Sequence, residues 1–421
     1  MAYRKVNDTS LASIADTLRS KGGTTEQLVF PQDFNKAIES LNTFTPPTSE
    51  ILDPDEVYRT TRPADWLPMP TPRDDEIYLL LHILDGIDGY FAANLIFSGV
   101  CSVEFGSVHN GLFVSQDSLT PVSETRFTKT LPYQDYGDVT SDGYRQCMIR
   151  IKGTVTRIFL GKDSIREPAS LLKDIVCGID LDGLSCSASG NNTADGNTSI
   201  RTLEYVRFVG NGGLKNLGTT FFGCNALRSL SCEKKNSATD GISTLRDCRS
   251  LVALSANFLC GLTGRTTYML AGCGIRHLPK FHATPASLDS MSYSNGCDFE
   301  RFTSEIFDTR NVTSFQNAFF RCTSLLEILG LRIDKATKFI NTFGYTYNLS
   351  RLTFAGETTP GGWTINLIDS CLEHAALIEM IESLPVATAA ATINLTGNPG
   401  ASQLTDEEIA VATSKNWTVT I

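Results

Sequence analysis

Apolar residues recur at a nearly constant step in the second half of the chain. The series is clearest at its cysteines, which lie 24 or 25 residues apart: Cys224, Cys248, Cys273, Cys297 and Cys322. The same step leads forward to Thr346 and Cys371 and back to Ile200. Residues three and six places after most of these sites are also apolar, as Leu227 and Leu230 show. A period of this length is typical of repeat proteins, in which each unit buries its apolar side against its neighbours.

The period predicts a solenoid of eight stacked units, one for each site from Ile200 to Cys371, with a continuous parallel β-sheet. Neighbouring strands of such a sheet lie ~4.8 Å apart, so the recurrent cysteines, with Thr346 as a substitute, would form a buried ladder of small side chains. The same spacing lies within the ~4.4–6.8 Å between Cα atoms that a disulfide allows. We expect free thiols, because the first residues do not have the pattern of an export signal; disulfides are the alternative.

Two short amphipathic helices are predicted in residues 1–45. Leu11, Ile14 and Leu18 form an apolar stripe that follows N-cap residues and ends before a pair of glycines. Phe34 and Ile38 lie on one face of a second helix that begins with a proline. Helices this short are marginal in water, so these residues are expected to anchor the segment on another copy or on a partner protein. A helical hairpin folded back on the next domain is an equally open alternative.

The rest of the chain divides by composition into four segments. Residues 46–75 hold seven prolines and predict an extended linker. Short runs rich in β-branched and aromatic residues predict a β-sandwich-like module over 76–175, whose last run, from Met148 to Phe159, alternates apolar with polar residues. The repeats occupy 176–371. Helix and strand patterns over 372–421, including Thr405 with Glu408 three places on, predict an α/β cap. The expected fold class is therefore mainly β with α.

Composition excludes several classes of protein. Of the 421 residues, 41% are hydrophobic and 19% are charged, which provides enough apolar material for a large core and argues against disorder. The formal net charge of −10 opposes sequence-independent binding to nucleic acid. The apolar runs are too short to cross a bilayer, so no membrane insertion is expected.

No sequence motif indicates catalysis or a bound cofactor. The sequence contains no nucleophile elbow, no zinc-protease helix and no phosphate-binding loop. Asp180 begins a run that looks like the start of a calcium loop but lacks the rest, so a turn is the simpler interpretation. Cys273, His277 and His282 are spaced loosely like metal ligands, but the repeat already accounts for Cys273. We therefore expect no enzyme activity, no cofactor and no metal.

One repeat is similar to a known family. Residues 307–325 begin Phe-Asp-Thr-Arg-Asn-Val-Thr and end Ala-Phe-Phe-Arg-Cys-Thr-Ser-Leu. This pattern resembles the leucine-rich-like repeats of bacterial surface proteins, and phage and prophage structural proteins of Gram-positive gut bacteria carry similar repeats. The helix pattern from Ser10, the Pro-rich segment around Trp66 and the final segment around Trp417 look like other parts of those phage proteins.

The resemblance implies a tail-associated or baseplate-associated protein of a phage or phage-like particle that contacts the host. Such a protein would be assembled in the bacterial cytoplasm and located on the virion, at the tail or tail tip. Its N-terminal element would bind other tail or baseplate proteins, and its leucine-rich-repeat-like solenoid would bind a host surface polysaccharide or protein. A homo-oligomer, for example a trimer, fits a fibre or tip protein.

Outward positions of the predicted parallel strands are the candidate receptor-binding residues. Side chains that flank the second apolar position of each repeat should point to solvent. These positions are Tyr205, Arg207, Ser229, Ser231, His277, Arg301, Glu327, Arg351 and Thr353. Tyr, Arg and His suit recognition of a polysaccharide or protein epitope. An ordinary solvated sheet face is the alternative.

Three other functions stay open from the sequence. A purely structural tail component would have no receptor contact, and its loss would stop particle assembly. A bacterial surface adhesin would carry the same kind of repeat. A glycan-cleaving enzyme would need a pair of carboxylates in a cleft and would release sugar products from host envelope.

Overall fold

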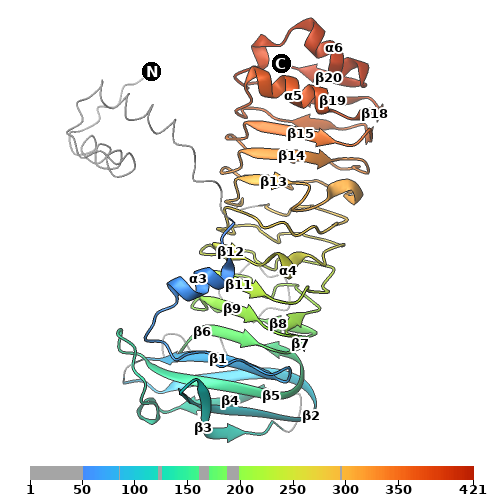
Figure 1. Cartoon of the computed structure of the whole chain (residues 1–421). Helices are drawn as coiled ribbons and strands as arrows, with labels where there is room; N and C mark the ends of the chain where they lie inside the picture. The colour runs from blue at the N-terminus through green and yellow to red at the C-terminus, as the bar shows by residue number, and fades with distance from the viewer. Residues whose placement is uncertain (1–50, 85, 122–125, 161–169, 187–198, 294–295) are drawn as a thin grey trace, which may run out of the picture. The chain divides into compact units, whose positions relative to one another are not determined.

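The structure is a computed structural model that describes residues 51–421, except 85, 122–125, 161–169, 187–198 and 294–295 (Figure 1). The chain divides into two units, Met1–Glu50 and Ile51–Ile421, and only the second contains described residues. The predicted anchoring residues lie outside the described part of the chain: Leu11, Ile14, Leu18, Phe34 and Ile38.

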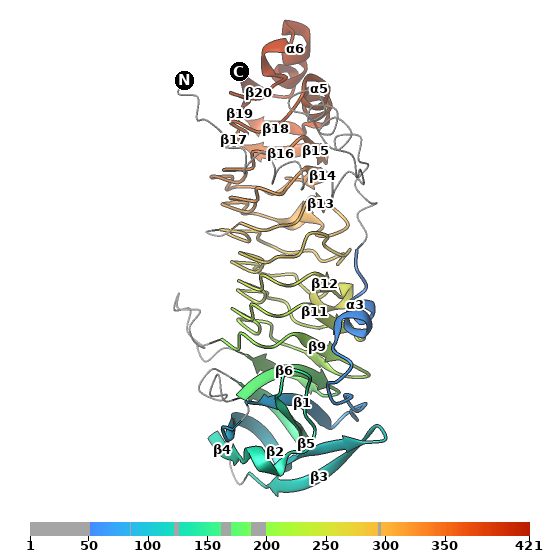
Figure 2. The ribbon, with the colours of Figure 1, turned by 90° about the vertical axis from the view of Figure 1, so that its left-hand side faces the viewer.

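A short helix, α3 (Pro54–Thr61), forms inside the segment that we expected to be an extended linker. Asp53 caps its N-terminus, since the Asp53 side chain accepts a hydrogen bond from the amide of Asp55 at 2.9 Å. Pro54 occupies the first turn, where no amide donor is needed. The helix ends ahead of Pro63, which disfavours helical backbone at the residue before it. Within this unit α3 lies against β11 and β12 (Figure 2).

A ten-stranded mixed sheet forms the first part of the unit. Its antiparallel portion consists of β1 (Glu76–Ile83), β2 (Gly89–His109), β3 (Leu112–Leu119), β4 (Arg126–Leu131) and β5 (Arg145–Phe159), with the 3-10 helix η1 (Tyr133–Asp135) before β5. Along β5, Ile149 and Ile151 are buried while Arg150 and Lys152 are half-buried. The alternation that the sequence shows over this run is therefore that of a strand with one face in the core.

The sheet changes from antiparallel to parallel at β6 (Ser170–Cys177). This strand pairs antiparallel with β1 on one edge and parallel with β9 (Tyr205–Phe208) on the other. β11 (Ser229–Cys232) and β12 (Ala253–Leu254) continue the parallel part, with Tyr205 opposite Ser229 and Ser229 opposite Ala253. The short strands β7 (Asp180–Leu181) and β8 (Gly183–Ser185) pair in parallel with β10 (Gly213–Leu214) and β5, respectively.

Smaller parallel sheets make up the rest of the unit. One contains β13 (Arg301–Thr303), β14 (Glu327–Arg332) and β15 (Arg351–Ala355); a second contains β16 (Thr358–Gly361) and β18 (Val386–Ala389); a third contains β17 (Thr364–Asn366), β19 (Ala391–Asn394) and β20 (Trp417–Thr420). Helix α4 (Ala256–Leu259) follows β12, and the 3-10 helix η4 (Thr309–Asn311) follows β13. In the described part of 260–300, neighbouring segments pair through isolated bridges such as Arg265 with Ser287.

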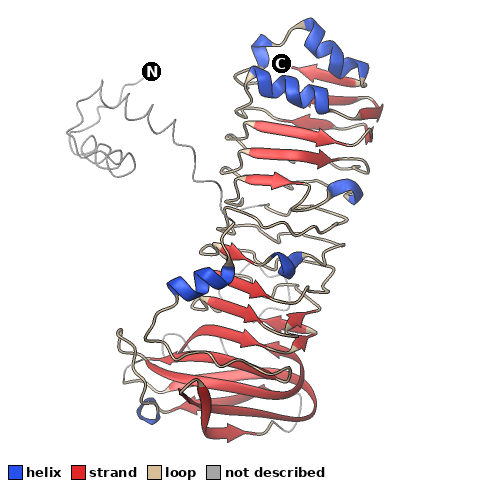
Figure 3. Ribbon diagram, viewed as in Figure 1, coloured by secondary structure: helices blue, strands red, loops and turns tan. Residues whose placement is uncertain are grey.

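The C-terminal segment, from His374 onward, contains the helices that have not yet been described (Figure 3). It consists of α5 (His374–Ser383), the 3-10 helix η5 (Ala401–Gln403) and α6 (Asp406–Ser414), together with β18, β19 and β20. A capping box begins α6: the Thr405 side chain accepts from the amide of Glu408, and the Glu408 carboxylate accepts from the amide of Thr405. Trp417 is buried, and its indole N–H donates to the carbonyl of Pro385 at 2.8 Å.

The predicted fold class is wrong. We expected a β-sandwich-like module followed by a separate leucine-rich-repeat-like solenoid with one continuous parallel sheet. The structure instead has one ten-stranded mixed sheet that crosses the expected boundary at residues 175 and 176, and several smaller parallel sheets after it. The physical reason lies at β6, whose second edge pairs with β9 and leaves no separate module. A sequence period gives the spacing of equivalent positions, but it does not show which of them form a hydrogen-bonded ladder.

One buried apolar cluster nevertheless extends from Ile77 in β1 to Trp417 in β20. The recurrent small residues belong to it or border it: Cys224, Cys248, Cys273, Cys297, Cys322 and Thr346 are buried, whereas Cys371 is exposed. All of these cysteines are free thiols. The Cys248 thiol donates to the carbonyl of Phe221 at 3.1 Å, and the Cys297 thiol donates to that of Leu270 at 2.9 Å. The thiols of these two cysteines are thus hydrogen-bonded to backbone carbonyls inside an apolar core.

Candidate functional site

Helix α3 covers the first four residues that we nominated for receptor binding. Tyr205, Ser229 and Ser231 are at most 4% exposed. The Ser229 hydroxyl donates to the carbonyl of Pro54 at 2.6 Å, and the Tyr205 and Thr61 hydroxyls are hydrogen-bonded at 3.0 Å. A receptor therefore has no access to Tyr205 or Ser229 while α3 is in place.

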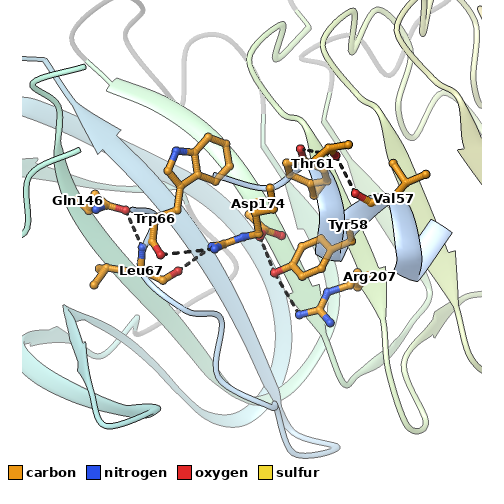
Figure 4. Close-up of polar contacts among 10 residues, drawn as sticks. Val57, Tyr58, Thr61, Trp66, Leu67, Gln146, Asp174 and Arg207 are labelled. Carbon is orange, nitrogen blue, oxygen red and sulfur yellow. Dashed lines mark hydrogen bonds and ion pairs between the residues drawn. The ribbon is translucent and has the colours of Figure 1, made fainter. Parts of the chain in front are cut away.

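Arg207, which is also one of these four residues, belongs to a buried ionic cluster under α3 (Figure 4). Asp174 of β6 is fully buried, and it accepts a hydrogen bond from the Tyr58 hydroxyl at 3.0 Å and forms an ion pair with Arg62 at 2.8 Å. The Arg207 guanidinium lies 3.9 Å from the centre of the Tyr58 ring and donates to its hydroxyl at 3.3 Å. Burial raises the pKa of Asp174, while Arg62 and Arg207 oppose that rise. The cluster holds α3 on the sheet and has a structural role.

Three other nominated residues form a row of alternating charge. Arg301 and Glu327 are ion-paired at 2.6 Å, and Arg351 approaches Glu327 at 4.0 Å. Arg351 also makes two hydrogen bonds to the carboxylate of Glu379, at 2.8 and 2.6 Å. Because these charges neutralise one another, the row offers little net field to a ligand. Thr353 accepts from the amide of Gly330 at 3.0 Å, and His277 is half-buried.

A different set of side chains lies on the turns next to the recurrent small residues. It contains aromatic rings interleaved with two arginines, and we call it the aromatic ladder. Its members are Phe222, Arg246, Tyr268, Tyr293, Phe320, Arg321, Tyr345 and Tyr347.

The rings of the aromatic ladder are in contact from one repeat to the next. The centroids of Tyr268 and Tyr293 are 6.3 Å apart, those of Tyr293 and Phe320 are 5.3 Å apart, and those of Phe320 and Tyr345 are 5.3 Å apart. Tyr345 then meets Tyr347 at 5.9 Å. Such distances lie in the range of favourable aromatic pairs, so neighbouring rings support one another.

The two arginines lie over rings of the same ladder. The Arg246 guanidinium is 5.1 Å from the centre of the Phe222 ring and 5.0 Å from that of Tyr268. The Arg321 guanidinium is 5.5 Å from the centres of both the Phe320 and Tyr345 rings. These are cation–π contacts, which restrict the long arginine side chains. Arg246 also faces the Asp247 carboxylate at 3.7 Å.

Three of the six rings of the aromatic ladder are exposed to solvent. Tyr345 is 49% exposed, Tyr347 47% and Tyr293 38%. Tyr268 and Phe320 are half-buried, and Phe222 is buried. A contiguous row of partly exposed aromatic side chains is unusual on a soluble surface and is characteristic of binding sites.

Three members of the ladder occupy a backbone conformation that disfavours bulky residues. The φ angles of Tyr268, Arg321 and Tyr345 are +55°, +60° and +64°. Arg321 and Tyr345 lie directly before Cys322 and Thr346. In other repeats that place, directly before the cysteine, holds glycines with positive φ: Gly223, Gly272 and Gly296. A non-glycine residue costs roughly 1–2 kcal/mol in this region. The same conformation occurs at Ser243, Asp247 and Asn317 on other turns, so it is a recurrent feature of the turn geometry.

Metal-binding clusters and membrane-spanning helices are both absent from the described residues. Among them, no group of three or more His, Cys, Asp or Glu side chains could hold a metal ion. None of the described helices has the length and apolar character needed to span a membrane. Comparisons with protein-family models, curated proteins and solved structures gave no match.

Sequence reasoning missed the aromatic ladder because it looked at the strands and not at the turns. The signal was nevertheless present in the same series of repeats. Each repeat from Cys224 to Thr346 places an aromatic residue or an arginine within five residues of its recurrent small residue, as Tyr268 lies five places before Cys273 and Phe320 two places before Cys322. What the sequence period could not show is that these side chains touch.

Proposed function

We propose that this protein is a non-enzymatic attachment component of a phage or phage-like particle, located at the tail or tail tip, and that it binds a host surface receptor through the aromatic ladder. The observation that carries the proposal is the row of exposed rings at Tyr293, Tyr345 and Tyr347. The resemblance of the repeats and of the segments around Trp66 and Trp417 to phage structural proteins supports the assignment to a particle.

The division of surfaces in the second unit supports the same proposal. The sheet face at β9 and β11 is occupied by α3, and the row at Arg301 and Glu327 is neutralised by its own ion pairs. The aromatic ladder, in contrast, combines exposed rings at Tyr345 and Tyr347 with an adjacent arginine, Arg321. Tyr and Arg are also the residues that contribute most to binding energy at interfaces.

The proposal is tested with particles that carry Tyr293→Ala, Tyr345→Ala and Tyr347→Ala together. We expect such particles to assemble normally and to lose adsorption to the host by about tenfold or more, because the exposed rings are removed without a change in the core. Adsorption is measured as the fraction of particles left in the supernatant after mixing with cells.

A matched control uses Arg301→Ala with Glu327→Ala, on the neutralised row. Those particles should adsorb as well as the unaltered ones. If the triple variant adsorbs normally, the attachment function at the aromatic ladder is wrong. If its particles do not assemble, the protein is a structural component instead.

A further inference from the structure

The spacing of the aromatic ladder identifies the kind of ligand that it fits. Tyr268, Tyr293, Phe320 and Tyr345 come from successive repeats, and their ring centroids follow one another at 6.3, 5.3 and 5.3 Å. This interval is comparable to the length of one sugar unit in an unbranched polysaccharide. A linear glycan presents the same group at a short constant interval along its whole length.

The chemistry of the ladder matches both parts of a sugar ring. Aromatic side chains contact the C–H groups of a pyranose, which are its apolar part. Arginine donates several hydrogen bonds in a fixed plane, which suits neighbouring hydroxyl groups or a carboxylate. The exposed Arg321 lies beside the Phe320 and Tyr345 rings, so a cation occurs next to apolar contacts. Arg246 is largely buried and faces the Asp247 carboxylate at 3.7 Å.

The fold holds the rings of the aromatic ladder in a row that runs from one repeat to the next. Its turns are connected by backbone hydrogen bonds between successive repeats, for example from the amide of Phe319 to the carbonyl of Thr342 at 3.0 Å and from that of Arg321 to the carbonyl of Gly344 at 2.8 Å. The rings are therefore held in a row before a ligand arrives. A preorganised row loses little conformational entropy when an extended chain binds along it.

We propose that the aromatic ladder binds one unbranched polysaccharide chain of the host surface, laid lengthwise across the repeats, with about one sugar unit at each ring. This inference rests on the proposed attachment function and specifies its receptor. It makes the ligand a periodic polymer, and the affinity then depends on the number of sugar units in contact.

The test uses the full chain and cell-wall polysaccharide extracted from a strain to which the protein binds. The polysaccharide is cut into fragments of increasing length, and the dissociation constant is measured for each by calorimetry. We expect affinity to rise with fragment length over the first four or so units, the number of consecutive rings, and then to level off. A length-independent affinity would overturn the lengthwise arrangement.

The variants Arg321→Gly and Tyr345→Gly separate binding from folding. Each removes a ladder side chain and at the same time relieves backbone of positive φ, as glycine does at Gly272 and Gly296. We expect the double variant to unfold at a temperature no lower than that of the unaltered chain and to bind the long fragment at least about tenfold more weakly. The matched control is Asn341→Gly, which makes the same backbone change at φ +52° without removing a ring. It should bind normally.

The outcomes distinguish this inference from the function on which it rests. If the double variant loses binding to cells but the extracted polysaccharide does not bind at all, the attachment function stands and the receptor is a protein. If protease treatment of the cells abolishes attachment and removal of the polysaccharide does not, the inference is likewise overturned. If no strain binds the protein, both proposals fail.

Discussion

At the scale of the residue, His82 shows how the second unit places a titratable group in its interior. The ring is 2% exposed, and it packs edge-on against Trp66 at 4.9 Å and parallel to Tyr144 at 5.9 Å. Burial lowers the pKa of His82 from 6.5 to about 3, and the charges of Lys173 and Arg62 act in the same direction. The histidine is therefore neutral in the folded protein across the physiological range.

A loss of stability on acidification follows from this shift. Below pH 6.5 the unfolded chain binds a proton at His82, whereas the folded chain does not until pH falls to about 3. The free energy of unfolding should therefore fall between these limits, by about 2 kcal/mol at pH 5 from this group. Denaturant unfolding of the protein and of His82→Phe at pH 7 and pH 5 measures the contribution, since the variant lacks it.

The matched control is His109→Phe, at an exposed position of β2. This variant should leave unchanged the difference between the free energies of unfolding at pH 7 and at pH 5. An equal pH dependence in the protein and in His82→Phe would show that His82 ionises in the folded state as it does in the unfolded chain.

At the scale of the element, α3 is held by specific polar contacts as well as by burial. Thr61 bonds to Tyr205, Pro54 accepts from Ser229, and Tyr58 bonds to Asp174. An eight-residue helix is not stable alone in water, so its tertiary contacts decide whether it forms. This is why the proline-rich composition of the segment predicted a linker and the structure has a helix there.

Replacing Asp174 with alanine should release α3. The change leaves Arg62 and Arg207 without the carboxylate that they face, and loss of one member of a buried ionic cluster costs about 3–5 kcal/mol. We expect a fall of this size in the free energy of unfolding, together with faster amide hydrogen exchange in residues 54–61 than in β1. The matched control is Glu305→Ala, which removes the exposed ion pair with Lys280 at 2.6 Å and should have no measurable effect. Unchanged exchange in α3 would contradict the role given to the cluster.

At the scale of the whole second unit, the core is continuous but the sheets are not. Buried apolar residues connect Ile77 to Trp417, while strand pairing passes from the ten-stranded sheet to three smaller parallel sheets and includes a stretch of isolated bridges near Arg265. The two C-terminal helices, α5 and α6, cover the end of this core. Leu377, Met380 and Ile381 of α5 are buried there. Where no named strands pair, backbone hydrogen bonds between turns still connect neighbouring repeats, for example from the amide of Leu245 to the carbonyl of Met269 at 3.0 Å.

Deleting residues 373–421 should make the protein associate with itself. The deletion uncovers the apolar residues that α5 packs against and frees the edge of β15, and an exposed edge strand pairs readily with another chain. We expect sedimentation velocity to show concentration-dependent species larger than those of the full chain. As a control, Thr405→Ala removes only the cap of α6, should cost about 1 kcal/mol, and should leave the sedimentation profile unchanged. A truncated chain that sediments as the full chain does would show that the end of the core needs no cover.

The sequence by itself determined the local features of this protein. The alternation from Met148 to Phe159 predicted the strand that became β5, and Thr405 with Glu408 predicted the capping box of α6, because these features depend on neighbours a few residues apart. The recurrent cysteines predicted positions that are buried in five repeats, since a period marks equivalent environments.

Only the tertiary structure decided which surfaces are covered and which side chains meet. The pairing of β6 with β9 joined two expected modules, and the position of α3 buried Tyr205 and Ser229. The aromatic ladder likewise depends on contacts between residues about 25 positions apart, such as Tyr268 and Tyr293. A linear pattern shows which side chains are apolar or aromatic, but pairing between distant segments depends on the free energy of the whole packed chain.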